Sequence, residues 1–222
     1  MSDTDARFDL SIVVCCHNSA ERLPETLDHL SKMDVDGLGV EVIVVDNLST
    51  DQTGAVAADR LSTSPKAFHW RVVTEKEIGL ANARRRGVCE AKGEIIVFCD
   101  DDNWLSEGYV QKVLSIFSAM PTVGAVGGSI EPFFEGSKRP PYWFWSHGGS
   151  FALGAQSLDS GILTQRGYLW GAGIAVRRDL LIRCYEAGIH SVLSGRSGLS
   201  LGSGDDTEIC KWRLLRNKGL YY

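Results

Sequence analysis

Short apolar runs alternate with amphipathic segments along the first half of the chain. Four runs rich in β-branched residues predict strands, at 10–15, 40–45, 70–74 and 94–99. Apolar residues at helical spacing predict a helix after each of the first three runs, as with Leu23, Leu27 and Leu30. The cluster 49–51 offers N-cap residues for the second helix, and 80–91 is the third. Apolar strands separated by helices predict an α/β fold with a mostly parallel central sheet flanked by helices.

The pattern weakens in the second half of the chain. From 131 to 168 it is rich in Gly, Pro and aromatic residues, and we interpret this part as loop with short strands. Loops this long are usually functional or disordered, and the aromatic content argues against disorder. The other elements predicted here are a helix at 109–120, strands at 123–128 and 169–176, a helix at 178–187, a flexible Gly- and Ser-rich segment at 195–204, a helix at 208–216 and the start of a strand at 218–222.

Length, charge and cysteine content narrow the class of protein. The 222 residues suit one sizeable domain, and a net charge of -5 lacks the basic excess of a nucleic-acid-binding protein. No apolar run approaches the roughly 20 residues of a membrane span, and the acidic N-terminus does not resemble a signal peptide. The six cysteines are scattered, which favours reduced thiols packed as small apolar residues over disulfides or a zinc site.

Acidic residues follow the fourth predicted strand directly, at Asp100, Asp101 and Asp102. Three carboxylates would repel one another unless solvent or a cation relieves them, and oxygen ligands suit Mg²⁺ or Mn²⁺. Alternation along an extended segment would put Asp100 and Asp102 on one face and Asp101 on the other. A solvated acidic turn that caps the next helix is the alternative. The position at a strand end, where α/β sheets bind ligands, favours the metal.

Other polar residues lie at the same predicted edge. Asp46 and Asn47 offer an acceptor and an amide for a base or ribose, or else cap the next helix. His17 has the ring to stack on a base, although a lone loop histidine is more often a surface residue. Of the three consecutive arginines from 84 to 86, a helix turns at most one or two toward a ligand, and we assign Arg84 as the inward one.

Five segments, in order, together resemble the family 2 glycosyltransferases, which have the GT-A fold. They are SIVVCCHNSAERLPETL, VIVVDNLSTDQT, GLANARRRGVCEAKGEIIVFCDDDNW, LWGAGIAVRRDLL and GSGDDTEIC. The resemblance runs over nearly the whole chain. It implies a single catalytic domain over 1–222, with a nucleotide-binding half at about 8–128 and an acceptor-binding half at about 129–222. Relatives usually continue past 218–222, so we expect a core trimmed at its C-terminus.

The resemblance also implies roles for individual residues. The donor would be bound by Cys15, His17, Asp46, Asn47, Gly79, Arg84, Asp100 and Asp101. Asp102 and Asp100 would hold Mn²⁺ or Mg²⁺ on the diphosphate, and Asp206 of the GDDTE segment would be the catalytic base. The acceptor would be bound by Trp170, Gly171, Asp205 and Glu208. Asn47 and Arg85 depart from the family, which more often has Asp and Asn there.

The implied activity is inverting transfer of a sugar from a uridine or thymidine diphosphate sugar to a hydroxyl of a saccharide or lipid-linked acceptor. By analogy the enzyme would work in the cytoplasm, either free or as a peripheral protein at the cytoplasmic face of a membrane, and without nucleic acid. A nucleotidyltransferase is the alternative within enzymes, but the segment CCHNSAERL lacks its basic, Gly-rich loop. An inactive sugar-binding module is another alternative. A dinucleotide-dependent oxidoreductase is disfavoured, because no GxGxxG motif follows any predicted strand. The aromatic run from Phe133 to Trp145 is interpreted as a lid whose rings, Phe133, Trp143 and Phe144, pack together or stack on sugar.

Overall fold

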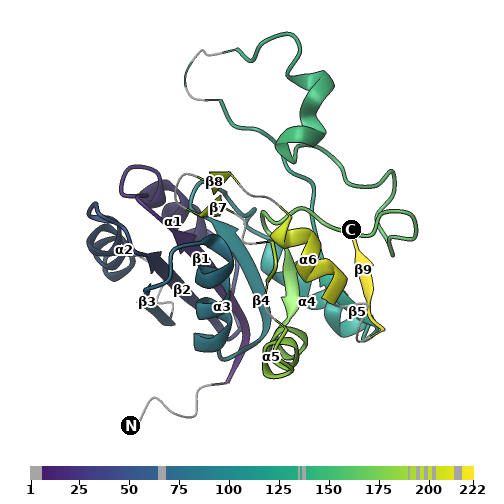
Figure 1. Ribbon diagram of the computed structural model, residues 1–222, viewed down its shortest axis with the longest axis horizontal. Coiled ribbons are helices and arrows are strands. Elements are labelled where there is room, and N and C mark those ends of the chain that lie inside the picture. The colour runs from purple at the N-terminus through teal and green to yellow at the C-terminus, as the bar shows by residue number, and fades with distance from the viewer. Residues whose placement is uncertain are drawn as a thin grey trace.

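The fold is described from a computed structural model that covers residues 7–64, 69–134, 136, 139–189, 191–193, 196–197, 200–201, 204–212 and 217–222. A seven-stranded sheet with the order β3-β2-β1-β4-β6-β5-β9 forms its centre (Figure 1). Its strands are β1 (Phe8–Cys16), β2 (Val40–Asn47), β3 (His69–Glu75), β4 (Gly93–Asp100), β5 (Val123–Val126), β6 (Ala175–Arg177) and β9 (Gly219–Tyr221). All pairings are parallel except those of β6, which runs antiparallel to β4 and β5.

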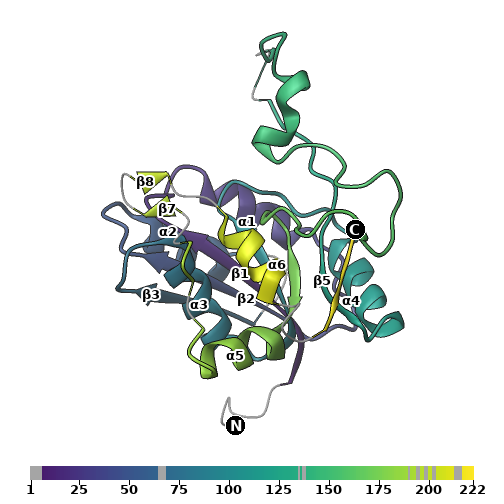
Figure 2. The same ribbon diagram turned by 45° about the vertical axis from the view of Figure 1, so that its right-hand side comes forward.

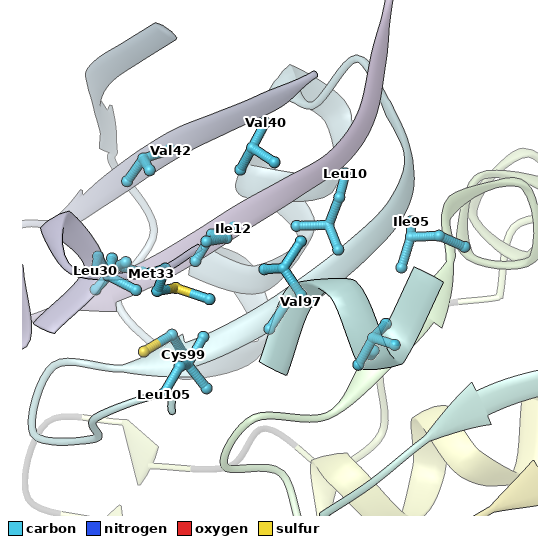
Figure 3. Close-up of a cluster of buried hydrophobic side chains, with 14 of the residues drawn as sticks. Leu10, Ile12, Leu30, Met33, Val40, Val42, Ile95, Val97, Cys99 and Leu105 are labelled. Carbon is cyan, nitrogen blue, oxygen red and sulfur yellow. The ribbon is translucent and has the colours of Figure 1, made fainter. Parts of the chain in front are cut away.

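Helices cover both faces of the sheet, which confirms the predicted α/β class. One core cluster joins the sheet to α1 (Leu23–Ser31), α2 (Thr53–Ser62) and α4 (Tyr109–Ala119). The opposite cluster joins it to α3 (Leu80–Glu90), α5 (Arg178–Glu186) and α6 (Asp205–Trp212). Strand β1 contributes to both clusters, because alternate side chains point to opposite faces of the sheet. Leu10 and Ile12 enter the first cluster (Figure 3). Val13 enters the second.

Helix α3 lies unusually close to β1. A Cβ added at Gly87 would lie only 2.3 Å from Val13 Cγ1, so the glycine permits this approach. This packing holds α3, which carries Arg84, against the strand that ends at the candidate site.

Several predicted boundaries differ from the structure. The predicted strand at 169–176 shortens to β6, because Gly173 has a φ of +72° and breaks the extended backbone. Its flank still pairs with β4, since the backbone N–H of Gly173 donates to Phe98 O at 2.9 Å. The second helix begins at Thr53, after the cap cluster, and the Asp51 carboxylate accepts from the Thr53 backbone N–H at 3.0 Å.

The last predicted helix begins at Asp205 rather than at 208. Carboxylates in a first turn stabilise a helix through its dipole, and α6 has three of them there, Asp205, Asp206 and Glu208. The predicted end of this helix, 213–216, lies outside the described residues. Within the segment 195–204, predicted to be flexible, the structure describes Gly204 and two antiparallel strands, β7 (Arg196–Ser197) and β8 (Ser200–Leu201); the rest lies outside the described residues.

The segment between β5 and β6 projects from the body of the molecule and carries a 3-10 helix, η1 (Trp145–Phe151), as both ribbon views show (Figures 1 and 2). The predicted strand after 218 is present as β9, which extends the sheet by pairing with β5. Among the described residues, none of the helices has the length and apolarity that a membrane crossing needs.

Candidate functional site

The register of the parallel strands brings the predicted polar residues to one edge of the sheet. Cys16 at the end of β1 pairs with Asp46 of β2, and Cys15 pairs with Asp100 of β4. The residues that follow these three strands therefore share the carboxyl edge of the sheet, the place where open α/β sheets bind ligands.

The three consecutive aspartates have different surroundings. Asp101 is buried and turned toward α1: Ser19 Oγ and Arg22 Nη2 donate to its carboxylate, the latter at 2.8 Å, and Thr26 Oγ1 donates to its backbone carbonyl at 2.9 Å. Asp102 is exposed and accepts from Asn103 Nδ2 at 2.9 Å. Asp101 thus fastens the end of β4 to α1, whereas Asp102 faces solvent.

Arg84 connects the acidic edge, which is formed by Asp100, Asp101 and Asp102 at the end of β4, to α6. Only 3% of Arg84 is exposed, while Arg85 and Arg86 are exposed, which confirms that Arg84 is the inward-facing arginine. Its Nη1 donates to the Asp205 carboxylate, and its Nη2 lies 3.7 Å from Asp100 Oδ1. Burial lowers the pKa of Arg84, but the nearby carboxylates of Asp205 and Asp100 raise it by more. The pKa is therefore above its ordinary value, and the guanidinium stays charged.

Glycine at position 171 lets Arg84 and Asp206 lie against the same point of the backbone. A Cβ there would lie 2.9 Å from Arg84 Nη2 and 3.2 Å from the Cβ of Asp206. Asp206, in the first turn of α6, is half-buried, and one carboxylate oxygen accepts from the Thr207 backbone N–H at 2.6 Å. The structure therefore brings the predicted base next to Gly171, with Asp205 fixed on Arg84 beside it.

Glu208, predicted to bind the acceptor, supports a loop instead of facing an open surface. Its carboxylate accepts from the backbone N–H of Val192 at 2.9 Å, from that of Leu193 at 3.3 Å and from Ser191 Oγ. Glu208 therefore fixes the backbone of residues 192–193 next to α6.

Asn47 has a similar supporting position on the opposite side of the site. It is buried; its Oδ1 accepts from the Gly79 backbone N–H at 2.7 Å, and its Nδ2 donates to Glu77 O at 2.7 Å. The side-chain amide predicted to contact a base or ribose therefore holds the loop before α3. Asp46 accepts from the Ser49 backbone N–H at 3.0 Å, but Ser49 precedes the start of α2 at Thr53, so this bond holds the turn before the helix and does not cap it.

His17 is exposed, and both of its ring nitrogens have hydrogen-bond partners, Nδ1 with Asn47 O and Nε2 with Asn18 Nδ2 at 3.4 Å. Nδ1 lies 2.7 Å from Asn47 O; because a carbonyl only accepts, Nδ1 carries the proton. Cys15 by contrast belongs to the core, where burial raises the pKa of its thiol to about 12 and keeps it neutral. Of the two, His17 has the side chain exposed for contact with a base.

The predicted acceptor floor centres on Trp170, which is buried. Its backbone N–H donates to Gln156 Oε1 at 2.7 Å, and the Gln156 amide in turn donates to Gly128 O at 3.0 Å. Arg166 stacks on the Trp170 ring with its Cζ 4.6 Å from the ring centroid. Sequence reasoning missed Gln156 and Arg166, because neither belongs to a recognisable motif.

Two features border the site. A pocket of about 330 Å³ opens between α3 and α6 and is lined by Arg84, Asp205, Asn82 and Trp212 among others. The aromatic segment, residues 133–151, carries rings that pack on one another: Phe144 contacts Phe134, Trp145 and Phe151. Phe133, predicted to join that cluster, contacts Trp104 instead.

Asp100 and Asp102 are the metal ligands that the sequence predicts at the acidic edge. Among the described residues, no three His, Cys, Asp or Glu side chains form a cluster able to hold a metal ion. Burial raises the pKa of Asp100, Arg84 opposes the rise, and Asp102 and Asp101 add to it. The carboxylates of Asp100 and Asp102 fit Mg²⁺ or Mn²⁺, which often take one or two protein carboxylates and phosphate oxygens.

This combination of fold and site defines a class. A mostly parallel sheet flanked by helices, with an acidic segment after β4 and a second acidic segment opening α6, is the GT-A type of α/β fold. The sequence pattern described as "Glycosyl transferase family 2" matches residues 11–183, and the chain belongs to that family.

Relatives and solved structures agree with this assignment. Glycosyltransferase GlyG of Streptococcus pneumoniae is 30% identical over 103 residues, 46% of this chain and 33% of GlyG. Putative glycosyltransferase EpsH of Bacillus subtilis is 26% identical over 105 residues, 47% of this chain and 29% of EpsH. The matched regions thus cover about a third of these curated relatives.

Two solved structures share the fold. S. aureus TarS 1-349 has a TM-score of 0.68 at 18% identity, over 96% of this chain and 59% of that one. The mannosyltransferase PcManGT of Pyrobaculum calidifontis, solved with GDP-Man and Mn²⁺, has a TM-score of 0.64 at 23% identity, over 96% of this chain and 54% of that one.

Proposed function

We propose that this chain is an inverting glycosyltransferase that moves a sugar from a nucleoside diphosphate sugar to an acceptor hydroxyl. The observation that carries the proposal is the meeting at Gly171: Asp206 and Arg84 both lie against this glycine, and Arg84 also lies 3.7 Å from Asp100. The residue proposed as the base therefore lies close to the guanidinium that pairs with Asp205 and lies near Asp100 of the acidic edge. TarS has also been solved with UDP-GlcNAc, which supports a nucleotide sugar as the donor class.

Asp206 is the general base of the proposed reaction. It takes the proton of the acceptor hydroxyl while that oxygen bonds to the anomeric carbon, because a neutral hydroxyl is a poor nucleophile. The bond from the anomeric carbon to the diphosphate oxygen breaks, and its electron pair leaves with the diphosphate. Attack opposite the leaving group inverts the anomeric configuration.

Donor binding falls to the carboxyl edge of the sheet. Asp100 and Asp102 would hold Mn²⁺ or Mg²⁺, which supplies positive charge to the leaving diphosphate. His17 offers its ring to the base, and Asp46 lies beside it at the end of β2. Asn47 acts indirectly by fixing Gly79, and Arg84 acts by fixing Asp205, since both side chains are buried and engaged.

Replacing Asp206 with Asn tests the base. We expect sugar transfer to fall about a hundredfold to ten-thousandfold, the usual contribution of a general base, with an unchanged circular dichroism spectrum. Asp179→Asn is the matched control, because Asp179 is an exposed aspartate in the first turn of α5. Transfer by Asp206→Asn at near the original rate, with the fold intact, would contradict the assignment.

A donor screen tests the reaction class. Uridine, thymidine and guanosine diphosphate sugars are supplied with Mn²⁺ or Mg²⁺, and release of nucleoside diphosphate is measured beside release of pyrophosphate. Nucleoside diphosphate release supports glycosyl transfer, whereas pyrophosphate release would indicate a nucleotidyltransferase. Proton NMR of the product then reports the anomeric configuration, and retention would refute the inverting mechanism.

A further inference from the structure

Arg166 is a cation held between two aromatic rings. Its Cζ lies 4.1 Å from the centroid of the Tyr168 ring and 4.6 Å from that of Trp170, both within the roughly 6 Å reach of a cation–π contact. Arg166 is half-buried, Trp170 is buried, and Tyr168 is 39% exposed. The guanidinium is therefore held in place while part of the assembly remains open to solvent.

The hydrogen-bonding capacity of this guanidinium is largely unused. Its Nε and Nη2 are buried and have no hydrogen-bond partner in the part of the chain that the structure describes. Ring faces accept N–H groups only weakly, so the two aromatic contacts do not replace the missing acceptors. Buried donors of a charged group that stay unpaired are costly, and such exceptions commonly mark a ligand, ion or water.

Other inward arginines have oxygen partners. Arg71 binds Glu41 at 2.8 Å, and Arg177 donates to the carbonyl oxygens of Val123 and Phe117, each at 2.8 Å. Arg84 binds Asp205 through Nη1, although its Nε is also unpaired among the described residues. At Arg166 the unpaired nitrogens Nε and Nη2 form the edge of the guanidinium that makes two parallel hydrogen bonds to a carboxylate or a phosphate. The geometry therefore points to an anion.

The position of Arg166 connects it to the acceptor side of the site. Trp170, on which it stacks, is followed directly by Gly171, which lies against Asp206. Gly171 also lies against Arg84, which is 3.7 Å from Asp100. An anion at Arg166 would thus lie beside the residue that precedes Gly171, near the proposed base.

We propose that Arg166 binds an anionic group of the acceptor, a phosphate or a carboxylate, through its Nε and Nη2, and that the exposed ring of Tyr168 packs against the adjoining sugar or polyol. The acceptor is then a phosphate- or carboxylate-bearing saccharide or polyol rather than a neutral sugar. Calling this ligand the acceptor rests on the proposed function. The binding of an anion at Arg166 does not.

The test is a calorimetric titration of the full chain, without metal or donor. The probes are glycerol 3-phosphate and glucuronate, and their neutral counterparts are glycerol and glucose. We expect one anionic probe to bind saturably, and its identity tells phosphate from carboxylate. Arg166→Gln should weaken that binding at least tenfold, and Arg166→Lys should restore only part of it, because an ammonium cannot form the two parallel hydrogen bonds. Arg183→Gln, at an exposed arginine of α5, should leave binding unchanged.

Two results would overturn the inference: neither anion binds more tightly than its neutral counterpart, or Arg166→Gln binds like the unaltered chain. Circular dichroism checks the fold of each variant, and Arg166→Lys, which keeps the charge and the stem, carries the test if Arg166→Gln does not fold. The donor screen separates this inference from the proposed function. Anion binding without nucleoside diphosphate release refutes the proposed function alone, and release without Arg166-dependent binding refutes this inference alone.

Discussion

Replacing either partner of the Arg84–Asp205 ion pair should lower the free energy of unfolding strongly. Replacing both should lower it by less than the sum of the two single losses. The two side chains are only 4% and 10% exposed, so a lone survivor keeps its charge in a place that water hardly reaches. Breaking a buried pair in this way typically costs about 3–5 kcal/mol. The variants are Arg84→Met, Asp205→Asn and the double variant.

The structure sets the order of the effects. Arg84→Met removes the counter-charge of Asp205 and also that of Asp100, 3.7 Å away, so we expect a loss near the upper limit, about 5 kcal/mol. Asp205→Asn leaves Arg84 beside Asp100, so we expect a loss near about 3 kcal/mol. The double variant has neither charge, and we expect a coupling free energy of about 2–3 kcal/mol between the sites.

Urea unfolding followed by tryptophan fluorescence measures these free energies. The slope of free energy against urea should stay constant, so that the midpoint alone reports stability. The matched control is Arg183 and Asp179 on α5, 3.5 Å apart and 59% and 55% exposed, where we expect coupling below about 1 kcal/mol. Additivity of the Arg84 and Asp205 substitutions within about 0.5 kcal/mol would refute the reasoning.

Two further predictions concern packing and metal. Gly87→Ala puts a Cβ 2.3 Å from Val13 Cγ1 and should lower the free energy of unfolding by about 1–3 kcal/mol. Gly108→Ala is the control: no atom lies within 4 Å of its new Cβ, so the free energy of unfolding should change little. Equal urea midpoints for the two variants would contradict the close approach of α3 to β1. A strong chelator should abolish nucleoside diphosphate release, and added Mn²⁺ or Mg²⁺ should restore it. Asp102→Asn should raise the metal concentration needed for half-maximal release. Release of nucleoside diphosphate at an unchanged rate in the presence of the chelator would exclude a required metal at Asp100 and Asp102.

The sheet was predictable because its strands are defined locally. The strands β1, β2 and β4 are apolar and buried on both faces, so hydrophobic pattern and run length were enough to predict them. Where backbone geometry decides, the pattern failed: residues 169–174 are as apolar as a strand, but Gly173 turns the chain. Pattern also missed Glu41, which is fully buried within the apolar run of β2 and paired with Arg71 of β3.

The candidate site was predictable as a location but not as a set of contacts. Strand ends placed Asp46, Asp100 and His17 at one edge, since parallel strands end together. The partner of each side chain depends on how distant elements pack. Asp101 turns to Ser19, 82 positions away, and Arg84 meets Asp205, 121 positions away. No local spacing encodes such pairs.

The charge balance at this edge bears on how an anionic donor would bind to a chain of net charge -5. Arg84 is shared by Asp205 and Asp100, and Asp102 next to it faces solvent, so the edge keeps an excess of negative charge. A bare diphosphate would be repelled there, whereas a diphosphate that arrives with a divalent cation would be attracted. Arg166 presents a cation without a carboxylate partner among the described residues. The two sides of the proposed reaction thus differ in sign: the donor side favours a metal complex, and the acceptor side favours an anion.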